Sequence, residues 1–277
     1  MTDVARRHSP FAQWLRGALA HPLARGIDLD SPEATEVHAR LIREKGFLRR
    51  LYASFYADYE DAVARSTPGG LVLEIGSGGG FYREIRPDVV SLDLRAGADV
   101  DVKASALEIP LRSGSVSTIV MLNVLHHLPD PRAFFREAAR VLRPGGRACL
   151  VEPFVSPLSR KLIRPLHHEP WEENAPWELP PAGPMSGANM AMPWAIFFRD
   201  RAAFDAQFID LPVDDIRLHT ALLYLLSGGV SMRSFLPGPL FFAARGFDRL
   251  LGPRTFSASM MTVGLVRRPT SSTAAQG

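Results

Sequence analysis

The chain has 277 residues, of which 46% are apolar and 22% are charged, and its formal net charge is +3. This length and composition fit one large α/β domain with a sizeable core, or two domains at most. Acidic and basic residues are interspersed, which excludes the concentrated basic surface of a typical nucleic-acid-binding protein. The single cysteine, Cys149, cannot form an internal disulfide, and the first residues lack the apolar core of a signal peptide, so we expect a cytoplasmic protein.

The first long element predicted is a helix over residues 31–65. Asp30 or Ser31 can cap this helix, and apolar side chains recur along it at helical spacing. Gly46 is expected to kink the helix or divide it in two.

A short strand and a glycine-rich loop come next. Residues 71–73 are apolar, Glu74 follows them, and glycines stand at positions 76, 78, 79 and 80. Glycine lets the backbone turn sharply off a strand and bring its N–H groups close to a ligand. We therefore expect a ligand-binding loop here, followed by a helix.

Strands and helices then alternate along the chain. Strands are predicted at residues 89–93, 116–123 and 147–151, and the last two are separated by a helix over residues 131–142 with Asp130 as its cap. This alternation predicts parallel βαβ units, and hence an α/β fold with a doubly wound, mostly parallel, Rossmann-like sheet.

The second half of the chain is less regular. Residues 152–215 are rich in proline and tryptophan, and a connection of this length usually serves as a lid or binding loop. A helix is predicted over residues 199–208 and a strand over residues 215–219. A final strand over residues 259–267 would suit an antiparallel edge or a hairpin.

Residues 220–244 contain one charged side chain, that of Arg233. They could form a buried helical pair, which we favour, the wall of an apolar pocket, or a surface that docks on a membrane. Glycines and prolines interrupt them before the roughly 20 residues that a membrane-spanning helix needs. The predicted domain organisation is an N-terminal helical cover (1–66) and a main domain (67–277) with lid or substrate-shaping insertions at about 153–214 and 220–255.

The spacing of the glycines distinguishes between two nucleotide-like ligands. Counted from Gly76, the dinucleotide fingerprint G-x-G-x-x-G needs glycine where the chain has Phe81. Counted from Gly78, it needs glycine where the chain has Arg83. Asp93 ends the second strand 17 residues beyond Gly76, close to the spacing at which an acid accepts the ribose hydroxyls of a nucleotide-like cofactor. The pattern therefore favours a nucleotide-like cofactor other than NAD.

From Glu74 the loop reads E-x-G-x-G-x-G and resembles the first motif of the class I S-adenosylmethionine-dependent methyltransferases. Residues 104–120 resemble the passage from the adenine contact into the fourth strand of this family. Residues 123–130 resemble its post-strand motif, and residues 141–146 its approach to the fifth strand. Together these motifs cover about residues 65–152, in the order of the family.

The resemblance implies that the cofactor is S-adenosylmethionine. The implied cofactor-binding residues are Glu74, Gly76, Ser77, Gly78, Gly80, Asp93, Ser105, Ala106 and Asn123. Glu74 and the loop would hold the methionine part, and Asp93 the ribose. Ser105 and Ala106 would meet the adenine edge, and Asn123 would face the donor near its methyl group. The family often has an acid in place of Ser105 and of Ser117, and a serine hydroxyl can accept the adenine hydrogen bond without charge assistance.

Histidines are the candidate catalytic residues. His126 and His127 follow the strand that would end beside the cofactor, and His167 and His168 lie in the predicted lid. A general base helps when the methyl acceptor is a hydroxyl or an acidic carbon, although either pair could instead cap or pack its own turn. We expect no metal, because adjacent histidines rarely bind one ion. The conceivable metal-binding set consists of His167, His168, Glu169 and Glu172.

The function implied by the resemblance is methyl transfer to a small, rather apolar acceptor, with oxygen as the first choice of acceptor atom and carbon as the second. Nitrogen is disfavoured because Asn123 is not followed by the Pro-Pro-aromatic signature of many amino methyltransferases. The alternatives are an NAD(P)-binding oxidoreductase or epimerase, and a non-catalytic module that retains the fold as a binding surface. No nucleic-acid partner is expected, contact with a membrane surface is open but not favoured, and the oligomeric state is left open.

Overall fold

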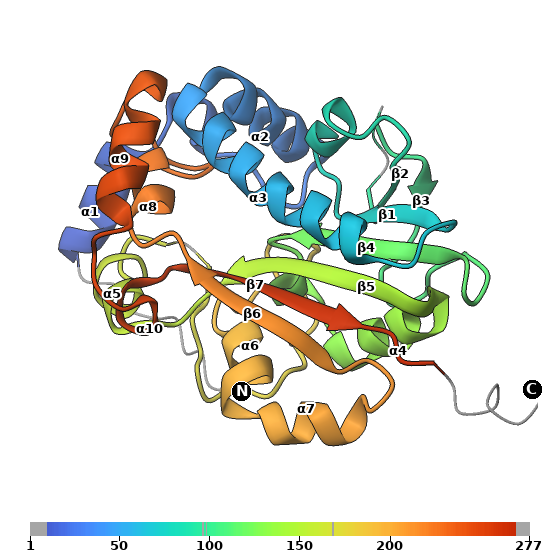
Figure 1. Ribbon diagram of the computed structural model, residues 1–277. Helices are drawn as coiled ribbons and strands as arrows, with labels where there is room; N and C mark the ends of the chain where they lie inside the picture. The colour runs from blue at the N-terminus through green and yellow to red at the C-terminus, as the bar shows by residue number, and fades with distance from the viewer. Residues whose placement is uncertain (1–9, 96, 98, 168, 270–277) are drawn as a thin grey trace, which may run out of the picture.

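The computed structural model describes residues 10–95, 97, 99–167 and 169–269, and within them one seven-stranded sheet forms the centre of the molecule (Figure 1). The strand order is β3-β2-β1-β4-β5-β7-β6. The strands are β1 (Leu71–Ile75), β2 (Val90–Asp93), β3 (Val102–Lys103), β4 (Val116–Leu122), β5 (Leu142–Pro153), β6 (Val213–His219) and β7 (Met260–Val266). Strands β1 to β5 are parallel, and β7 is antiparallel to both of its neighbours, so the predicted mostly parallel, doubly wound sheet is confirmed.

Helices cover both faces of the sheet (Figure 1). The figure shows α2 and α3 over one face and α4, α6 and α7 against the other. These helices are α2 (Pro32–Glu44), α3 (Gly46–Arg65), α4 (Pro131–Val141), α6 (Met192–Trp194) and α7 (Arg201–Gln207). The predicted division at Gly46 is confirmed, and Ser31 rather than Asp30 caps α2, since its Oγ accepts a hydrogen bond from the backbone N–H of Ala34 at 3.3 Å.

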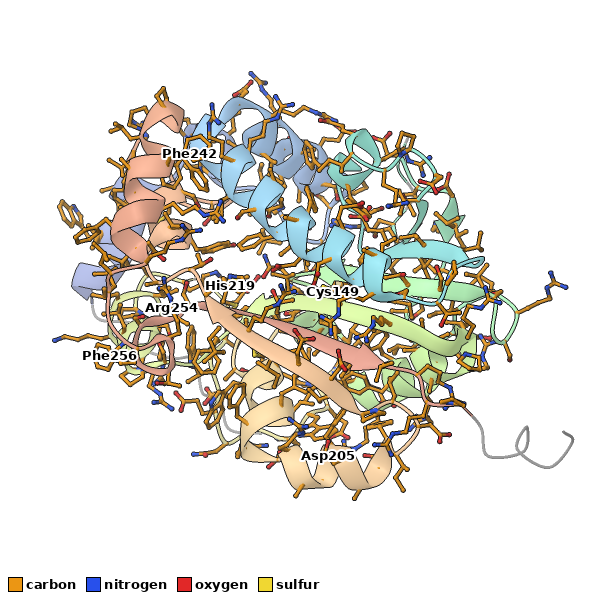
Figure 2. All side chains as sticks on the ribbon, viewed as in Figure 1. Cys149, Asp205, His219, Phe242, Arg254 and Phe256 are labelled. Atoms are coloured by element: carbon orange, nitrogen blue, oxygen red, sulfur yellow. The ribbon has the colours of Figure 1, made fainter. Side chains whose placement is uncertain are left out.

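The central strands alternate between two apolar cores. Ile119 of β4 and Leu150 of β5 point into the core that contains the aromatic rings of α4 and α7. Val120 and Cys149, one position along, point into the core formed with α3, and Figure 2 labels Cys149 beside this helix. Because both faces are covered, the first six residues of β4 are all buried, as its β-branched sequence predicts.

Two helix predictions differ from the structure. Only the single 3₁₀ turn η2 (Phe81–Glu84) follows the glycine loop, because Pro87 prevents a helix from continuing through the residues before it. The predicted helix 199–208 is confirmed as α7 with narrower bounds, because Asp200 has a non-helical backbone and residues before it form a π-helical turn, η4 (Ala195–Arg199).

Two strand predictions also need correction. Strand β5 starts at Leu142, which pairs with Val116 of β4, so the Arg-Pro-Gly-Gly turn belongs to the strand. Strand β7 is not an edge strand but lies between β5 and β6. The polar, half-exposed sequence of β6 suits the edge, whereas the side chains of β7 are mostly buried.

The remaining short helices lie at the ends of the sheet. They are α1 (Pro10–Leu19), η1 (Pro22–Ala24), η3 (Leu125–His127), α5 (Pro157–Leu162), α8 (Leu223–Ser227), η5 (Gly238–Leu240), α9 (Phe241–Asp248) and α10 (Arg254–Ser257). Residues 220–244 thus contain α8, η5 and the start of α9. Among the described residues, no helix has both the length and the apolar character that crossing a membrane requires.

The register of the parallel strands brings their carboxyl ends to one edge of the sheet. Ile75 of β1 lies opposite Leu92 of β2, and Leu122 of β4 lies opposite Val151 of β5. The strand order reverses between β1 and β4, and in open α/β sheets ligands bind outside the carboxyl ends at such a point.

Candidate active site

A cavity of about 450 Å³ opens at this edge of the sheet. Its volume lies within the range of about 300–1,000 Å³ typical of small-molecule sites. Of the residues predicted to bind a cofactor, those that line it are Glu74, Gly76, Ser77, Gly78, Asp93, Ser105, Ala106 and Asn123. Gly80 is not among the lining residues. It turns the chain with φ +70°, and a Cβ there would lie 2.5 Å from the Cβ of Asp99.

The glycine loop packs against the turn after β4 and is hydrogen-bonded to the end of β2. Gly76 has φ +70°, and a Cβ on it would lie 2.4 Å from a Cγ of Val124. Its N–H donates to the carbonyl of Leu92 at 2.8 Å. The N–H of Gly78 donates to the carboxylate of Asp93 at 3.2 Å, which ties the loop to the end of β2. The loop therefore needs glycine at position 76 for steric as well as conformational reasons.

Two buried oxygens in the cavity have no hydrogen-bond partner. They are Oε2 of Glu74 and Oγ of Ser77. Buried polar atoms are normally hydrogen-bonded, so these two suit a polar or cationic group of a ligand. Burial raises the pKa of Glu74 to about 8, and the charge of Asp93 contributes to this shift. The ammonium and carboxylate of the methionine part of S-adenosylmethionine fit such a donor and acceptor set, so the residues present are compatible with that cofactor.

The stability of the ligand-free protein is expected to depend on Glu74 in a defined pH window. Its ordinary pKa is 4.5 and its pKa in the folded chain is about 8, so the unfolded chain ionises first as the pH rises. The folded state then binds more protons, and stability is lost between these two values. Unfolding of the wild type and of Glu74→Gln should be compared at about pH 5 and about pH 9. The variant should gain stability relative to the wild type at the higher pH, and a difference independent of pH would contradict this assignment.

The predicted nucleoside-binding residues lie at the ends of β2 and β3. Asp93 also accepts a hydrogen bond from the N–H of Arg95 at 3.0 Å. The Oγ of Ser105 accepts one from the N–H of Leu107 at 3.1 Å, so this hydroxyl shapes its own turn. Ser117 lies at the amino end of β4, where its hydroxyl donates to the carbonyl of Leu71 at 3.0 Å. It does not line the cavity, so its difference from the family pattern does not affect the adenine contacts.

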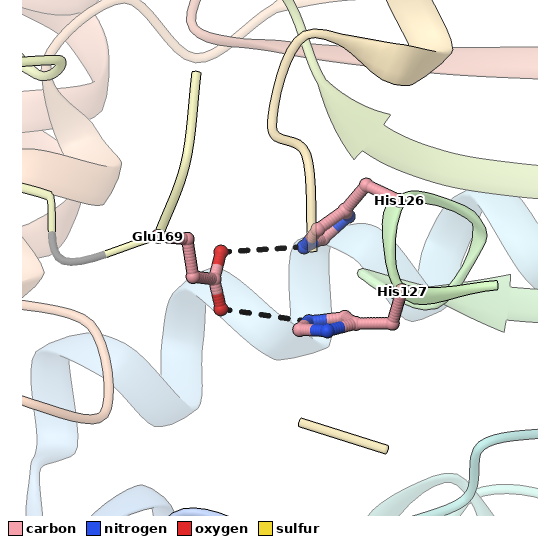
Figure 3. Close-up of side chains that lie close together, drawn as sticks. All are labelled: His126, His127 and Glu169. Atoms are coloured by element: carbon pink, nitrogen blue, oxygen red, sulfur yellow. Dashed lines mark ion pairs between the residues drawn. The ribbon is translucent and has the colours of Figure 1, made fainter. Parts of the chain in front are cut away.

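His126 is held between two carboxylates (Figure 3). Its Nδ1 lies 2.6 Å from Oε2 of Glu152, and its Nε2 lies 3.5 Å from Oε2 of Glu169. The other oxygen of Glu152 accepts hydrogen bonds from the N–H groups of Val124 at 2.8 Å and Leu125 at 2.7 Å. Burial alone would lower the pKa of His126, but the two carboxylates outweigh it and raise that pKa to about 10.

His127 lies beside the other oxygen of the same carboxylate, that of Glu169. Its Nε2 lies 3.5 Å from Oε1 of Glu169, and its Nδ1 lies 3.1 Å from the carbonyl of Gly187. Burial, together with the charge of His126, lowers the pKa of His127 to about 4. Burial opposes the ionisation of Glu169, but the surrounding histidines hold its pKa well below the usual range. His127 is therefore neutral at pH 7 but a weak base.

Of the residues in the predicted lid that could bind a metal, the structure brings His167 and Glu169 together. His167 lines the cavity, with Nδ1 3.7 Å from Glu169, whereas Glu172 is exposed. His168 lies outside the described residues. Among the described residues, the group with donor atoms close enough to share an ion is His126, His127 and Glu169.

The proline-rich segment contributes to this site through its backbone. Met185 N–H donates to Asp30 at 2.8 Å, which anchors the segment to the N-terminal part of the chain. Asn189 N–H donates to the carbonyl of His126 at 2.9 Å. These contacts, with that of Gly187, place the segment at the wall of the cavity, and its role as a lid stays a prediction.

Sequence reasoning missed Glu152 and the pairing of Glu169 with the first histidine pair. The signal for Glu152 was present, since an acid directly follows the apolar run 148–151 and the end of that strand lies beside the end of β4. Glu169 carried no such signal, because its contact with His126 spans a long irregular segment.

Known proteins resemble the chain over its central part. Residues 73–150 match a family model described as a methyltransferase domain. An uncharacterized methyltransferase of Mycobacterium sp. (strain KMS) is 36% identical over 113 residues, which cover 35% of this chain and 45% of that protein. A ubiquinone biosynthesis O-methyltransferase of Xanthomonas axonopodis pv. citri (strain 306) is 31% identical over 121 residues, or 36% of this chain and 48% of that protein. The match thus spans less than half the length of these curated relatives.

Among solved structures, the geranyl diphosphate C-methyltransferase of Streptomyces coelicolor A3(2) has a TM-score of 0.48 and 16% identity, and the alignment covers 94% of this chain and 99% of that one. Residues 73–150 thus match a methyltransferase domain, and the mostly parallel sheet with the glycine loop at its edge has the Rossmann-like arrangement expected of such a domain.

Proposed function

We propose that this protein transfers a methyl group from S-adenosylmethionine to a small, rather apolar acceptor, with oxygen as the first choice of acceptor atom and carbon as the second. The observation that carries the proposal is that one cavity is lined by the glycine loop and Asp93 at one side and by the His126–His127–Glu169 group at another. The proposed donor site and a polar cluster thus line the same cavity.

The donor would occupy the edge of β1, β2 and β4. Its ammonium group would lie near Glu74, with the loop backbone around the methionine part, and Asp93 would accept hydrogen bonds from the ribose. Ser105 and Ala106 would border the adenine. Asn123, which directly follows β4 and has φ 55°, would lie near the methyl group.

The acceptor would lie against the apolar part of the cavity. This part is lined by side chains from α2 and α3, from the proline-rich segment, and from residues 224–232. They include Ile42, Tyr52, Tyr56, Ile163, Trp171, Met190, Tyr224 and Met232. An apolar wall with a few polar groups at one point favours a compact acceptor with a single reactive polar atom. Residues 220–244 would therefore serve as a pocket wall as well as a packed helical segment.

Bound S-adenosylmethionine supplies a methyl group on an already activated sulfonium, so that a bond forms from the acceptor to carbon while the C–S electron pair stays on sulfur. The task left to this chain is to position the acceptor in line and to accommodate its proton. The Nε2 atoms of His126 and His127 face Glu169 at the cavity wall, where they would contact a hydroxyl of the acceptor (Figure 3). The name of the Xanthomonas relative, an O-methyltransferase, also favours oxygen.

Asp93→Ala is expected to weaken the binding of S-adenosylmethionine by more than about tenfold, the loss of roughly one charge-assisted hydrogen bond. Calorimetric titration of both proteins with the cofactor measures this ratio. Asp88→Ala, which removes an exposed acid near the start of the same strand, is the matched control and should bind as the wild type does. Equal affinities for wild type and Asp93→Ala would show that the ribose lies elsewhere.

The proposed activity is tested by incubating the protein with S-adenosylmethionine carrying an isotopically labelled methyl group and an extract of small molecules from the source cells. Mass spectrometry should detect a labelled apolar product that depends on the protein and is lost with Asp93→Ala. Binding of the cofactor without a labelled product from any extract fraction would favour a non-catalytic binding module.

A further inference from the structure

We infer that His126, His127 and Glu169 form a binding site for a divalent transition-metal ion, with Zn²⁺ as the best fit. One donor atom from each residue, a ring nitrogen of each histidine and a carboxylate oxygen of Glu169, lies within 4.8 Å of the other two. Two histidines and one glutamate, with a further position open, are a known ligand set for catalytic zinc.

The distances fit an ion better than a direct hydrogen bond. Both Nε2 atoms lie 3.5 Å from an oxygen of Glu169, each from a different one. A hydrogen bond between an imidazolium and a carboxylate would be about 2.7–2.9 Å long. Ligands at about 2.1 Å from a tetrahedral zinc are separated from each other by about 3.4 Å. Figure 3 shows each oxygen of Glu169 facing a different imidazole ring, and an ion shared by the three groups would lie between them.

The outer nitrogens of both histidines are already engaged. Nδ1 of His126 lies 2.6 Å from Glu152, and Nδ1 of His127 lies 3.1 Å from the carbonyl of Gly187. Histidines that bind metals almost always donate their second ring N–H to a carboxylate or a backbone carbonyl, which fixes the tautomer and turns the free nitrogen to the ion. Here His126 has the carboxylate partner and His127 has the carbonyl partner.

The charges support the same assignment. Glu152 is fully buried and the side chain of Glu169 is 11% exposed, and both lie beside His126. Two carboxylates at low exposure are costly unless positive charge compensates them. His126 and His167, whose Nδ1 lies 3.7 Å from Glu169, supply positive charge when they are protonated, and a divalent ion at Glu169 supplies two units without a proton.

The site opens toward the proposed acceptor. All three ligands line the cavity, and the side chain of His127 is 9% exposed, so one coordination position can be reached from the cavity. An acceptor hydroxyl at that position would release its proton to water more readily, because a metal ion lowers the pKa of a bound hydroxyl. This catalytic use rests on the proposed methyl transfer, whereas metal binding itself does not.

The test is a measurement of zinc binding to the full chain after treatment with EDTA. The protein is equilibrated with Zn²⁺ near neutral pH, its metal content per chain is determined by mass spectrometry, and its affinity by competition with a chromophoric chelator. We expect one ion per chain. Glu169→Gln and His127→Gln should each weaken binding by about 100-fold or more, and Glu152→Gln by about 10- to 100-fold. Glu172→Gln, an exposed acid in the same segment, should bind zinc as the wild type does.

Cobalt supplies a second readout that is independent of activity. Co²⁺ in the wild type should show the intense visible absorption of a tetrahedral site, and Glu169→Gln should not. Absence of zinc uptake by the wild type, or equal uptake by Glu169→Gln and Glu172→Gln, would overturn the inference. Titration of the same EDTA-treated protein with S-adenosylhomocysteine separates the two proposals, because cofactor binding without zinc uptake defeats only the metal site, and zinc uptake without cofactor binding defeats only the methyl transfer.

Discussion

Replacing Glu152 with alanine is expected to lower the free energy of unfolding by about 3–5 kcal/mol, the usual cost of breaking a buried charge pair by removing one partner. The carboxylate is fully buried and accepts hydrogen bonds from the backbones of Val124 and Leu125 as well as contacting His126. Its removal leaves two backbone donors without partners and a charged imidazole without its nearest counter-ion. The turn between β4 and α4 would lose its main support.

Thermal unfolding of EDTA-treated protein measures this effect. A loss of this size should lower the melting temperature by about 10 °C in a chain of this length. Glu178→Ala is the matched control, because Glu178 is exposed and pairs with Arg132 at the surface. It should shift the melting temperature by no more than about 2 °C. If Glu152→Ala melts within the range of the control, Glu152 does not organise this turn.

Gly76→Ala is expected to have the second-largest effect, destabilising the chain by about 2–5 kcal/mol and weakening cofactor binding at least about tenfold. Two costs add at this position. The backbone has φ +70°, a conformation that L-residues rarely adopt and glycine adopts freely. The new methyl group would also lie 2.4 Å from the short, branched side chain of Val124. Relief of this overlap would displace the loop that lines the donor part of the cavity.

Gly114→Ala separates the two costs. Gly114 has a similar φ of +68°, but nothing lies within 4 Å of a Cβ built there, and it is remote from the cavity. This variant should lose only about 1–2 kcal/mol and should bind S-adenosylhomocysteine normally. Chemical denaturation and calorimetric titration of the two variants give both quantities. Equal stability and equal affinity of the two variants would contradict the steric argument.

The sequence predicts which residues gather at the carboxyl ends of β1 and β2, because its signals there are local. A strand, a glycine loop and an acid at the end of the next strand require only short-range order, and parallel pairing brings their ends together. Glu74, Gly76 and Asp93 accordingly line one cavity. The roles assigned to them in holding the cofactor stay predictions.

The acceptor side depends on contacts that no local pattern encodes. His127 meets the carbonyl of Gly187, and His126 meets Glu169, through a segment without regular secondary structure over most of its length. Such a segment takes its path from packing and from single hydrogen bonds, such as that between Asp30 and Met185. The position of β7 inside the sheet was missed for a related reason, since strand order is set by long-range pairing.

The most direct test of the central claim, that this cavity binds the methyl donor, is calorimetric titration of the full chain with S-adenosylhomocysteine and, in parallel, with NAD⁺ and NADP⁺. We expect one S-adenosylhomocysteine per chain with an affinity of about micromolar order, and no heat of binding from either dinucleotide at concentrations about a hundredfold higher. Tighter binding of NAD⁺ or NADP⁺ than of S-adenosylhomocysteine would contradict the account and favour an oxidoreductase or epimerase.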